Sequence, residues 1–268
     1  MLATAVWGFS FPAVKFALGY FDTFTVMFMR SLLAALVLGI FLWWNKSKMS
    51  VEDWKAGTIV GVVMAAAFIT QTYGQTMISA TGSAFITGLY VLFAPILAAV
   101  FLTQMPSRRL MVCTLVAMVG LFFLCDASFG LGLGEILTGV CAILFAVGLL
   151  LLSKYKARDS ARLIFVQMVV CTLISGIAMV ALGHVPTHFE IEPVLAILYL
   201  GLFAGAFAYW AQARAQQVLP VAEAGILLLG EPVFAGIFSV LFFGEMLNGL
   251  QLLGAGLILL GMYGAEKK

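Results

Sequence analysis

Long apolar stretches of this 268-residue chain contain ionisable side chains, among them Lys15, Arg30, Arg214 and Glu231. If these stretches cross a membrane, each charge is costly to bury, and such residues mark the paths of substrates, ions or protons. Arg214 falls close to the end of its stretch, where a long side chain can reach the interface. The other three are therefore the candidates for chemistry within the membrane.

Lys15 and Arg30 are expected at similar depth on consecutive helices, as a positive patch facing a cavity open to the outside. A carboxylate or phosphate group on a substrate would suit such a patch. The alternative is a structural contact, in which one of them pairs with Glu231 or with backbone carbonyls. Arg30 favours that alternative slightly, because the residue at its equivalent position in the second half of the chain is apolar.

Glu231 lies between Gly230 and Pro232. Proline has no N–H to donate, which leaves the carbonyl of Leu228 unpaired. A polar break near the middle of a membrane helix is where transporters coordinate substrates and ions. Glu231 is thus a candidate proton carrier, and the alternative is a hydrogen-bonded packing residue.

Aromatic and amide side chains accompany these charges. Trp7, Phe11 and Lys15 are spaced by four and share one helix face, which fits either a cavity wall or ordinary core packing. Amide side chains within a membrane must find polar partners. Tyrosines supply rings and hydroxyls to a pocket, but they also belong to interfacial belts. The further cavity candidates of these types are Gln71, Tyr90, Tyr209 and Gln212.

The composition indicates that lipid is the solvent of this chain. Hydrophobic residues make up 63% and charged residues 10%, with a mean hydropathy of +1.13, whereas soluble domains carry about 25% charge. A bilayer core needs about 20 helical residues for each crossing. The continuous apolar runs exclude a β-barrel and predict an all-α integral membrane protein with ten spanning helices, at 2–19, 23–44, 55–78, 82–103, 109–125, 133–153, 161–182, 194–215, 221–243 and 247–265.

The basic residues of the predicted loops all fall on one side of the membrane. An excess of Lys and Arg in short loops marks the cytoplasmic side, so both termini are predicted to be cytoplasmic. The residues concerned are Lys46, Lys48, Lys55, Arg108, Arg109, Lys154, Lys156, Arg158, Arg162, Lys267 and Lys268.

The second half of the chain also resembles the first. The shift that places Gln71 on Gln212 also places Gln104-Met105 on Glu245-Met246. Each half holds five predicted helices, and an odd number reverses the orientation of the second half. The sequence therefore predicts two inverted five-helix repeats, 1–125 and 126–268, with a site between them near the midplane.

Several classes of function lack their motifs. The sequence has no GxxxxGK[ST] phosphate loop, no HExxH and no Cys/His metal spacing. The cysteines lie in apolar runs, and the charges are segregated rather than pooled as in a nucleic-acid binder. We therefore expect that the protein is not an enzyme and that it has no cofactor, metal or nucleic-acid partner. We also expect no cleavable signal peptide. The first predicted helix starts almost at Met1, so we also expect it to be short at its cytoplasmic end.

Several segments of the chain resemble the EamA-type branch of the drug/metabolite transporter superfamily. The resemblance covers essentially the whole chain. It rests on Trp7 to Phe11 leading to Lys15, Phe24 to Ala35 with Arg30, Gly82 to Pro95, Ala222 to Pro232, and Gly244-Glu245 with the glycine-rich helix that follows. A departure is Gln104, where the family commonly has an acidic residue.

The resemblance implies ten helices in two inverted repeats and a central cavity between them. It also implies export or exchange of small metabolites, often amino acids or related compounds, through the bacterial inner membrane. Carried over residue by residue, the Trp-Gly…Lys element of the family falls on Trp7, Gly8 and Lys15, and its arginine falls on Arg30.

Together these observations predict a secondary transporter that works by alternating access. Its partners are a small-molecule substrate and the lipid bilayer, with a homodimer possible. A passive facilitator without ion coupling is the alternative, and a non-transporting membrane scaffold or enzyme is the third class. The predicted cavity residues are Trp7, Phe11, Lys15, Arg30, Gln71, Tyr90, Tyr209 and Gln212, with Glu231 as the proton-coupling candidate.

Overall fold

The computed structural model describes residues 1–125, 132–156, 158–186, 191–243 and 246–266. Throughout these residues the regular structure is helical, with no strand. Lipid leaves backbone groups no partner outside the chain, and a helix satisfies them internally. The topology prediction also used Lys267 and Lys268, and the predicted repeat used Glu245; these three residues lie outside the described residues.

The helices follow the predicted apolar runs closely. They are α1 Leu2–Ala17, α2 Thr23–Trp44, α3 Val51–Met77, α4 Ala80–Gly88, α5 Tyr90–Leu102, α6 Arg108–Leu124, α7 Leu133–Lys154, α8 Ser160–Ala181, α9 Val194–Leu198, the π-helix η1 Tyr199–Phe207, α10 Ala208–Ala215, α11 Val221–Leu228, α12 Gly230–Phe243 and α13 Gly249–Glu266.

Seven stretches of the described chain are long and apolar enough to cross a membrane. Two further apolar helices, Leu2–Ala17 and Gly249–Ala265, are shorter. The prediction of ten spanning helices stays a prediction. The seven stretches are Thr23–Trp44, Val51–Met77, Ala80–Leu102, Leu133–Lys154, Ser160–Ala181, Val194–Ala215 and Val221–Phe238.

Two of the predicted continuous helices are broken in the middle. The run 82–103 is divided at Leu89 and the run 221–243 at Leu229. At each break a backbone N–H donates to the carbonyl oxygen three residues earlier instead of four. The N–H of Leu89 donates to Ile86 and that of Leu229 donates to Ile226, both at 3.2 Å. In the second run, Pro232 withdraws a donor from the carbonyl of Leu228, next to the break.

A third predicted helix, 194–215, contains the π-helix η1 between α9 and α10. π-helical turns are rare and frequently lie at functional sites. A carbonyl of this stretch is used by another helix, because the Nε1 of Trp7 donates to the oxygen of Ala204 at 2.9 Å. The helix at the corresponding place in the first half, α3, is α-helical throughout.

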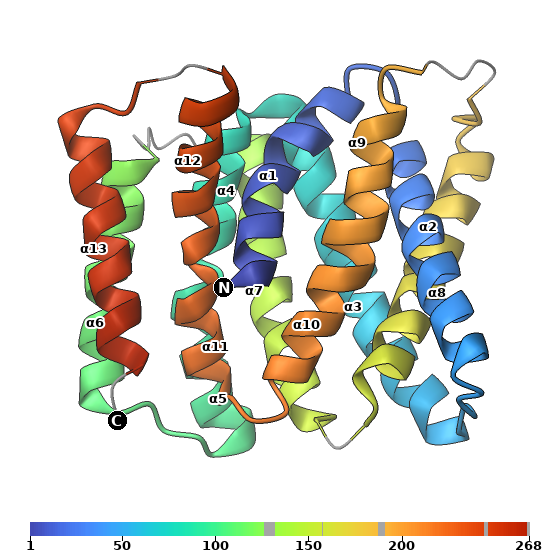
Figure 1. Ribbon diagram of the computed structural model, residues 1–268, viewed down its shortest axis with the longest axis horizontal. Coiled ribbons are helices and arrows are strands. Elements are labelled where there is room, and N and C mark those ends of the chain that lie inside the picture. The colour runs from blue at the N-terminus through green and yellow to red at the C-terminus, as the bar shows by residue number, and fades with distance from the viewer. Residues whose placement is uncertain (126–131, 157, 187–190, 244–245, 267–268) are drawn as a thin grey trace.

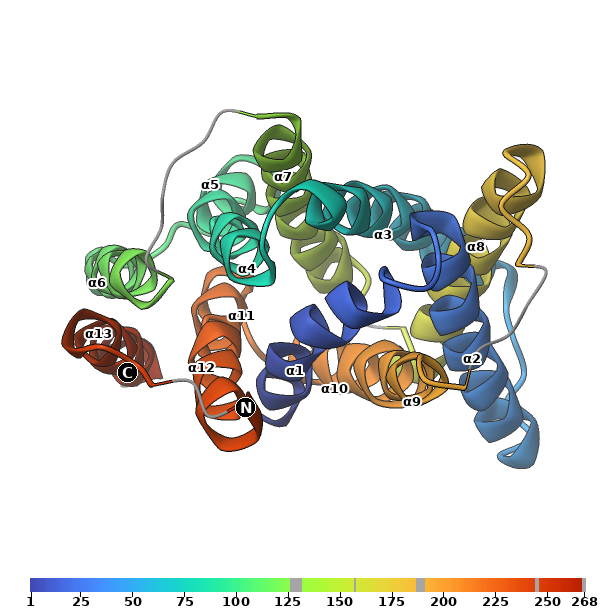
Figure 2. The same ribbon diagram turned by 90° about the horizontal axis from the view of Figure 1, so that it is seen from above.

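The helices stand side by side in a bundle (Figure 1). α6 and α13 form a pair at one edge, α2 and α8 form a pair at the other, and the broken helices lie between them (Figure 2). Glycines bring these helices close together. A Cβ on Gly57 of α3 would come within 2.4 Å of the Cβ of Val166 of α8, and one on Gly254 of α13 within 2.5 Å of the carbonyl of Gly120 of α6.

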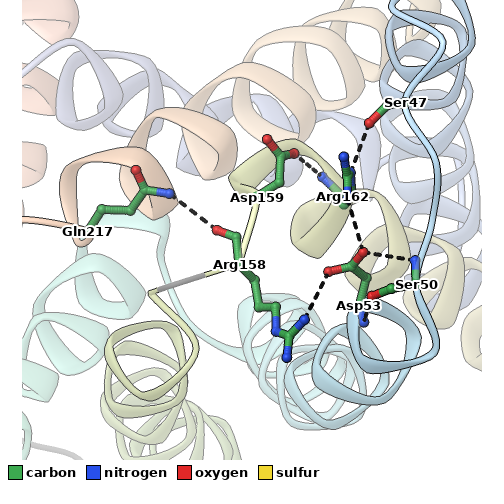
Figure 3. A network of polar contacts seen from close by, with 7 residues as sticks. All are labelled: Ser47, Ser50, Asp53, Arg158, Asp159, Arg162 and Gln217. Atoms are coloured by element: carbon green, nitrogen blue, oxygen red, sulfur yellow. Dashed lines mark hydrogen bonds and ion pairs between the residues drawn. The ribbon is translucent and has the colours of Figure 1, made fainter.

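A polar network ties several helix ends together at the end of the bundle where α2 and α7 finish (Figures 1 and 3). Its centre is Asp53, which is 3% exposed and forms a capping box with Ser50 at the start of α3. The carboxylate of Asp53 lies 3.4 Å from Arg162 and 3.9 Å from Arg158. Gln217, just after α10, donates to the carbonyl oxygen of Arg158 at 3.2 Å. The network therefore joins the starts of α3 and α8 to the end of α10.

Candidate functional site

A cavity lies in the centre of the bundle, where the two broken helices meet α1, α2, α3, α7, α8 and α10. Its volume is about 60 Å³, so it is narrow. Its lining residues are Trp7, Ser10, Phe11, Val14, Arg30, Met64, Phe68, Gln71, Gln75, Thr87, Tyr90, Phe145, Gly148, Leu149, Leu152, Gln167, Tyr209, Gln212, Leu228 and Glu231.

Aromatic rings form one wall of this cavity. The rings of Trp7 and Tyr209 lie 4.8 Å apart, and Phe68 contacts Tyr209 at 5.4 Å and Phe145 at 5.9 Å. The bond from Trp7 to Ala204 fixes the indole. These edge-to-face and tilted contacts hold the rings in place, so the wall is preformed on side chains from α1, α3, α7 and α10.

Arg30 is the cation of the cavity. It is only 6% exposed, and its guanidinium carbon lies 5.3 Å from the centre of the Phe68 ring. That arrangement gives a cation–π attraction. Within the described residues Arg30 makes no hydrogen bond and no ion pair. Its N–H donors are therefore available to a bound anionic group.

Glu231 supplies the carboxylate of the cavity, from the first turn of α12. It has no hydrogen bond or ion pair with any other described residue. Its backbone is held against α1, because a Cβ on Gly8 would come within 2.8 Å of the Glu231 carbonyl oxygen. The position of Glu231 thus depends on a glycine contact, while its side chain remains free to bind a proton or a ligand.

The amide side chains of the cavity are only partly paired. Gln71 donates to the hydroxyl of Thr87 at 3.0 Å, and Gln75 donates to the hydroxyl of Ser83 at 3.2 Å. The Oε1 atoms of Gln75 and Gln212 are buried and accept no bond from the described residues. Gln167 is unpaired at both amide atoms. Buried polar groups normally have partners, so these atoms are candidates for contact with a ligand.

Lys15 is placed differently from the sequence-based expectation. It is exposed and does not belong to the cavity lining. Its ammonium donates to the carbonyls of Gln75 at 2.5 Å and Ile78 at 3.0 Å, at the C-terminal end of α3. A cation there satisfies carbonyls that the helix leaves open. This geometry corresponds to the structural alternative for Lys15.

The structure brings the other predicted residues together in one lining: Trp7, Phe11, Arg30, Gln71, Tyr90, Tyr209, Gln212 and Glu231. Sequence reasoning did not select Gln167, Phe68 and Phe145. Gln167 carried a usable signal, since it is an amide within an apolar run, like Gln71. The two phenylalanines carried none, because nothing distinguishes them from the other rings of the chain.

Comparisons with known proteins agree with this architecture. The model of the EamA-like transporter family matches residues 1–125 and 132–265. A helical bundle with apolar spans and a polar central cavity is the form of a multi-pass membrane transporter. The chain belongs to the EamA-like transporter family, within the drug/metabolite transporter superfamily.

Individual relatives bear similar names. An uncharacterized transporter of Archaeoglobus fulgidus is 32% identical over 97% of this chain and 82% of its own length. The uncharacterized transporter YwfM of Bacillus subtilis is 25% identical over 82% of this chain and 76% of its own length. A solved crystal structure has the same fold, with a TM-score of 0.83 and 15% identity over 99% of this chain and 94% of the other.

Proposed function

We propose that this chain is a secondary transporter that exports or exchanges a small metabolite, an amino acid or a related compound, across the bacterial inner membrane by alternating access. The observation that carries the proposal is the central cavity, in which neither Arg30 nor Glu231 has a hydrogen-bond or ion-pair partner among the described residues. Burying two unpaired charges is costly. A substrate with groups of opposite charge would compensate both.

The helix boundaries support two repeats within one membrane domain, 1–125 and 126–268. The shift that places Gln71 on Gln212 also places the start of α4 on the start of α11, and the start of α6 on the start of α13. The same shift brings the break at Leu89 next to the break at Leu229. This recurrence is what ten helices in two copies of a five-helix unit require.

The packing supports an inverted relation between those units. α1 packs on α12, and its counterpart α7 packs on α5, the counterpart of α12. α2 pairs with its own counterpart α8, and α6 pairs with α13. Such exchanged pairs are expected for repeats related by a two-fold axis in the membrane plane. The cavity follows the same relation, since the shift that pairs Gln71 with Gln212 also pairs Tyr90 with Glu231, and all four line it.

The distribution of charge supports cytoplasmic termini. α2, α5, α7, α10 and α13 all finish at one end of the bundle (Figure 1). The basic loops follow these helix ends, and basic loops stay in the cytoplasm.

In this proposal Arg30 binds an anionic group of the substrate, and the aromatic wall holds its apolar part. Glu231 binds and releases a proton as the two units rock, which couples transport to the proton gradient. The narrowness of the cavity corresponds to a closed conformation, so loading and release need the units to move apart. Lys15 acts on the end of α3 rather than on the substrate.

The proposal is tested with purified protein in liposomes. A thermal-shift screen against L-amino acids, organic acids and nucleosides identifies ligands, and each ligand is then followed by counterflow and by uptake driven by a pH gradient. We expect ligand-dependent stabilisation, counterflow, and accumulation that requires the gradient. Counterflow without accumulation would indicate the passive facilitator instead. Liposomes that exchange none of the compounds would contradict transport of this substrate class.

A further inference from the structure

We propose that Gln167 contacts the transported substrate and, together with Arg30, holds its anionic group. This inference rests on the function proposed for the cavity and deepens it. Gln167 is carried by α8 and lines the cavity with Arg30 and Tyr209.

The amide of Gln167 is buried and has no hydrogen-bond partner among the described residues. The residue is 0% exposed, and neither Nε2 nor Oε1 has a hydrogen-bond partner in the described part of the chain. A buried donor or acceptor that is left without a partner destabilises the fold. A leucine at this position would avoid that cost, so stability alone does not account for the amide.

Gln216 is a second buried glutamine, with 1% of its surface exposed, and it differs from Gln167 in its contacts. The Nε2 of Gln216 donates to the carbonyl of Leu149 at 3.0 Å, whereas its Oε1 accepts no bond from the described residues, and Gln216 is not part of the cavity lining. Gln216 therefore connects α10 to α7 across the bundle. Gln167 makes no such connection, and this difference separates an amide that supports the fold from one that faces a ligand.

The place of Gln167 on α8 is fixed by packing. The backbone of α8 is pressed against α3 at this level, because a Cβ on Gly61 would lie 3.1 Å from both the Cα and the carbonyl oxygen of Gln167. One turn further along α8, the Sγ of Cys171 donates to the carbonyl oxygen of Gly61 on α3 at 3.6 Å. Side chains four residues apart share a helix face. The backbone of Gln167 is thus held against α3, and its side chain lines the cavity together with Arg30 of α2.

The chemistry of the two groups is complementary. A guanidinium offers N–H donors in a planar fork, and a glutamine amide adds two further donors without charge. A carboxylate has two oxygens that can accept bonds from both residues at once. The carbonyl oxygen of the amide remains available to a donor elsewhere on the same substrate, so Gln167 would select for both the anionic group and its orientation.

The first test compares Gln167→Leu with the matched control Gln216→Leu by thermal unfolding of purified protein. We expect Gln167→Leu to melt at or above the wild-type temperature, because an unpaired amide is removed. Gln216→Leu should melt below it, because the bond to Leu149 is lost. Equal destabilisation by the two variants would overturn the proposal, since Gln167 would then support the fold.

The second test uses thiol reagents and needs no identified substrate. In protein whose Cys113, Cys125, Cys141 and Cys171 are replaced by alanine, Gln167→Cys is treated with the anionic reagent sulfonatoethyl methanethiosulfonate. The cationic reagent trimethylammonioethyl methanethiosulfonate is used in parallel, and rates are normalised to those of a free thiol. A cationic site should favour the anionic reagent by about tenfold, and Arg30→Gln should abolish that preference.

Gln216→Cys serves as the matched control, and it should remain unmodified. An unreactive Gln167→Cys, or a preference that survives Arg30→Gln, would overturn the proposal. Both tests read out without transport. A result that contradicts the role proposed for Gln167 would therefore be seen even where liposomes exchange substrate normally. A failure of transport would be seen separately in the liposome assay.

Discussion

Asp53 and Glu231 are both carboxylates in the first turn of a helix, yet their surroundings differ in every respect that matters for function. Asp53 accepts a bond from the backbone N–H of Ser50 at 3.0 Å and pairs with Arg158 and Arg162 (Figure 3). Glu231 has no partner among the described residues, although it lies in the interior of the bundle.

The difference shows how this chain divides its buried polar groups between two tasks. At the end of the bundle the groups satisfy one another, and the network holds the helix ends in a fixed arrangement. In the cavity Arg30 and Glu231 form no ion pair with each other, and the proposed function assigns their charges to a ligand and to a proton. The comparison predicts that substitutions in the network reduce stability, whereas substitutions in the cavity reduce transport.

The largest effect is expected from Glu231→Gln. The variant keeps the size of the side chain but cannot exchange a proton, so uptake driven by a pH gradient should fall at least roughly tenfold in liposomes. Its melting temperature should stay near that of the wild type, because Glu231 supports no contact of the fold. Unchanged gradient-driven uptake would remove Glu231 from the coupling mechanism.

Arg30→Gln should come next. Hydrogen bonds to charged groups contribute about 1.5–3 kcal/mol, which corresponds to a loss of affinity of roughly tenfold to a hundredfold for an anionic substrate. The measurement is the half-saturation concentration in counterflow, with Arg214→Gln as the control. Arg214 is exposed and bonds to Gln217 at 3.0 Å, outside the cavity. Equal losses in both variants would show that the effect is not specific to the cavity.

Asp53→Asn tests the other side of the comparison. The loss of charge weakens the contacts with Arg158 and Arg162 and the bond that Asp53 accepts from Ser50, which should lower the stability by about 1 kcal/mol, the typical net contribution of a hydrogen bond. Thermal unfolding in detergent is the measurement, and Glu52→Gln at the exposed neighbouring position is the control. Asp53→Asn should leave ligand affinity unchanged. A variant that unfolds normally but loses affinity would contradict the division of tasks.

The smallest effect is expected from Lys15→Gln. The lysine contacts the last carbonyls of α3 from an exposed position, and such contacts stabilise a helix end by about 0.3–1 kcal/mol. The melting temperature should fall slightly, and the half-saturation concentration for an anionic substrate should not change. A large rise in that concentration would return Lys15 to the substrate site.

Much of the fold could be predicted from the sequence, because lipid permits few alternatives to a helix. The predicted runs and the observed helices differ mostly at their ends. The breaks were harder to predict. Pro232 gave a covalent reason for the one near Leu229, but the π-helix from Tyr199 to Phe207 has no proline and no signal in its composition.

The candidate site shows the same limit. Arg30, Glu231, Gln71 and Gln212 could be identified from the sequence, because polar side chains are scarce in apolar runs. Lys15 was not distinguishable from Arg30 by type. Its direction depends on the reach of a flexible side chain and on where α3 ends, and both are consequences of tertiary packing rather than of local pattern.

The second half contains the π-helix η1, whereas α3 at the corresponding place in the first half is α-helical throughout. Each residue of an α-helix turns the chain by roughly 100°, since 3.6 residues complete a turn. If η1 were to tighten into α-helical geometry, everything beyond it would swivel about the helix axis. Tyr209 and Gln212, which follow η1 directly, would be carried out of the cavity. A change of winding in one helix would thus remove lining side chains from one side of the cavity only, while Phe68 and Gln71 on the continuous α3 stay in place.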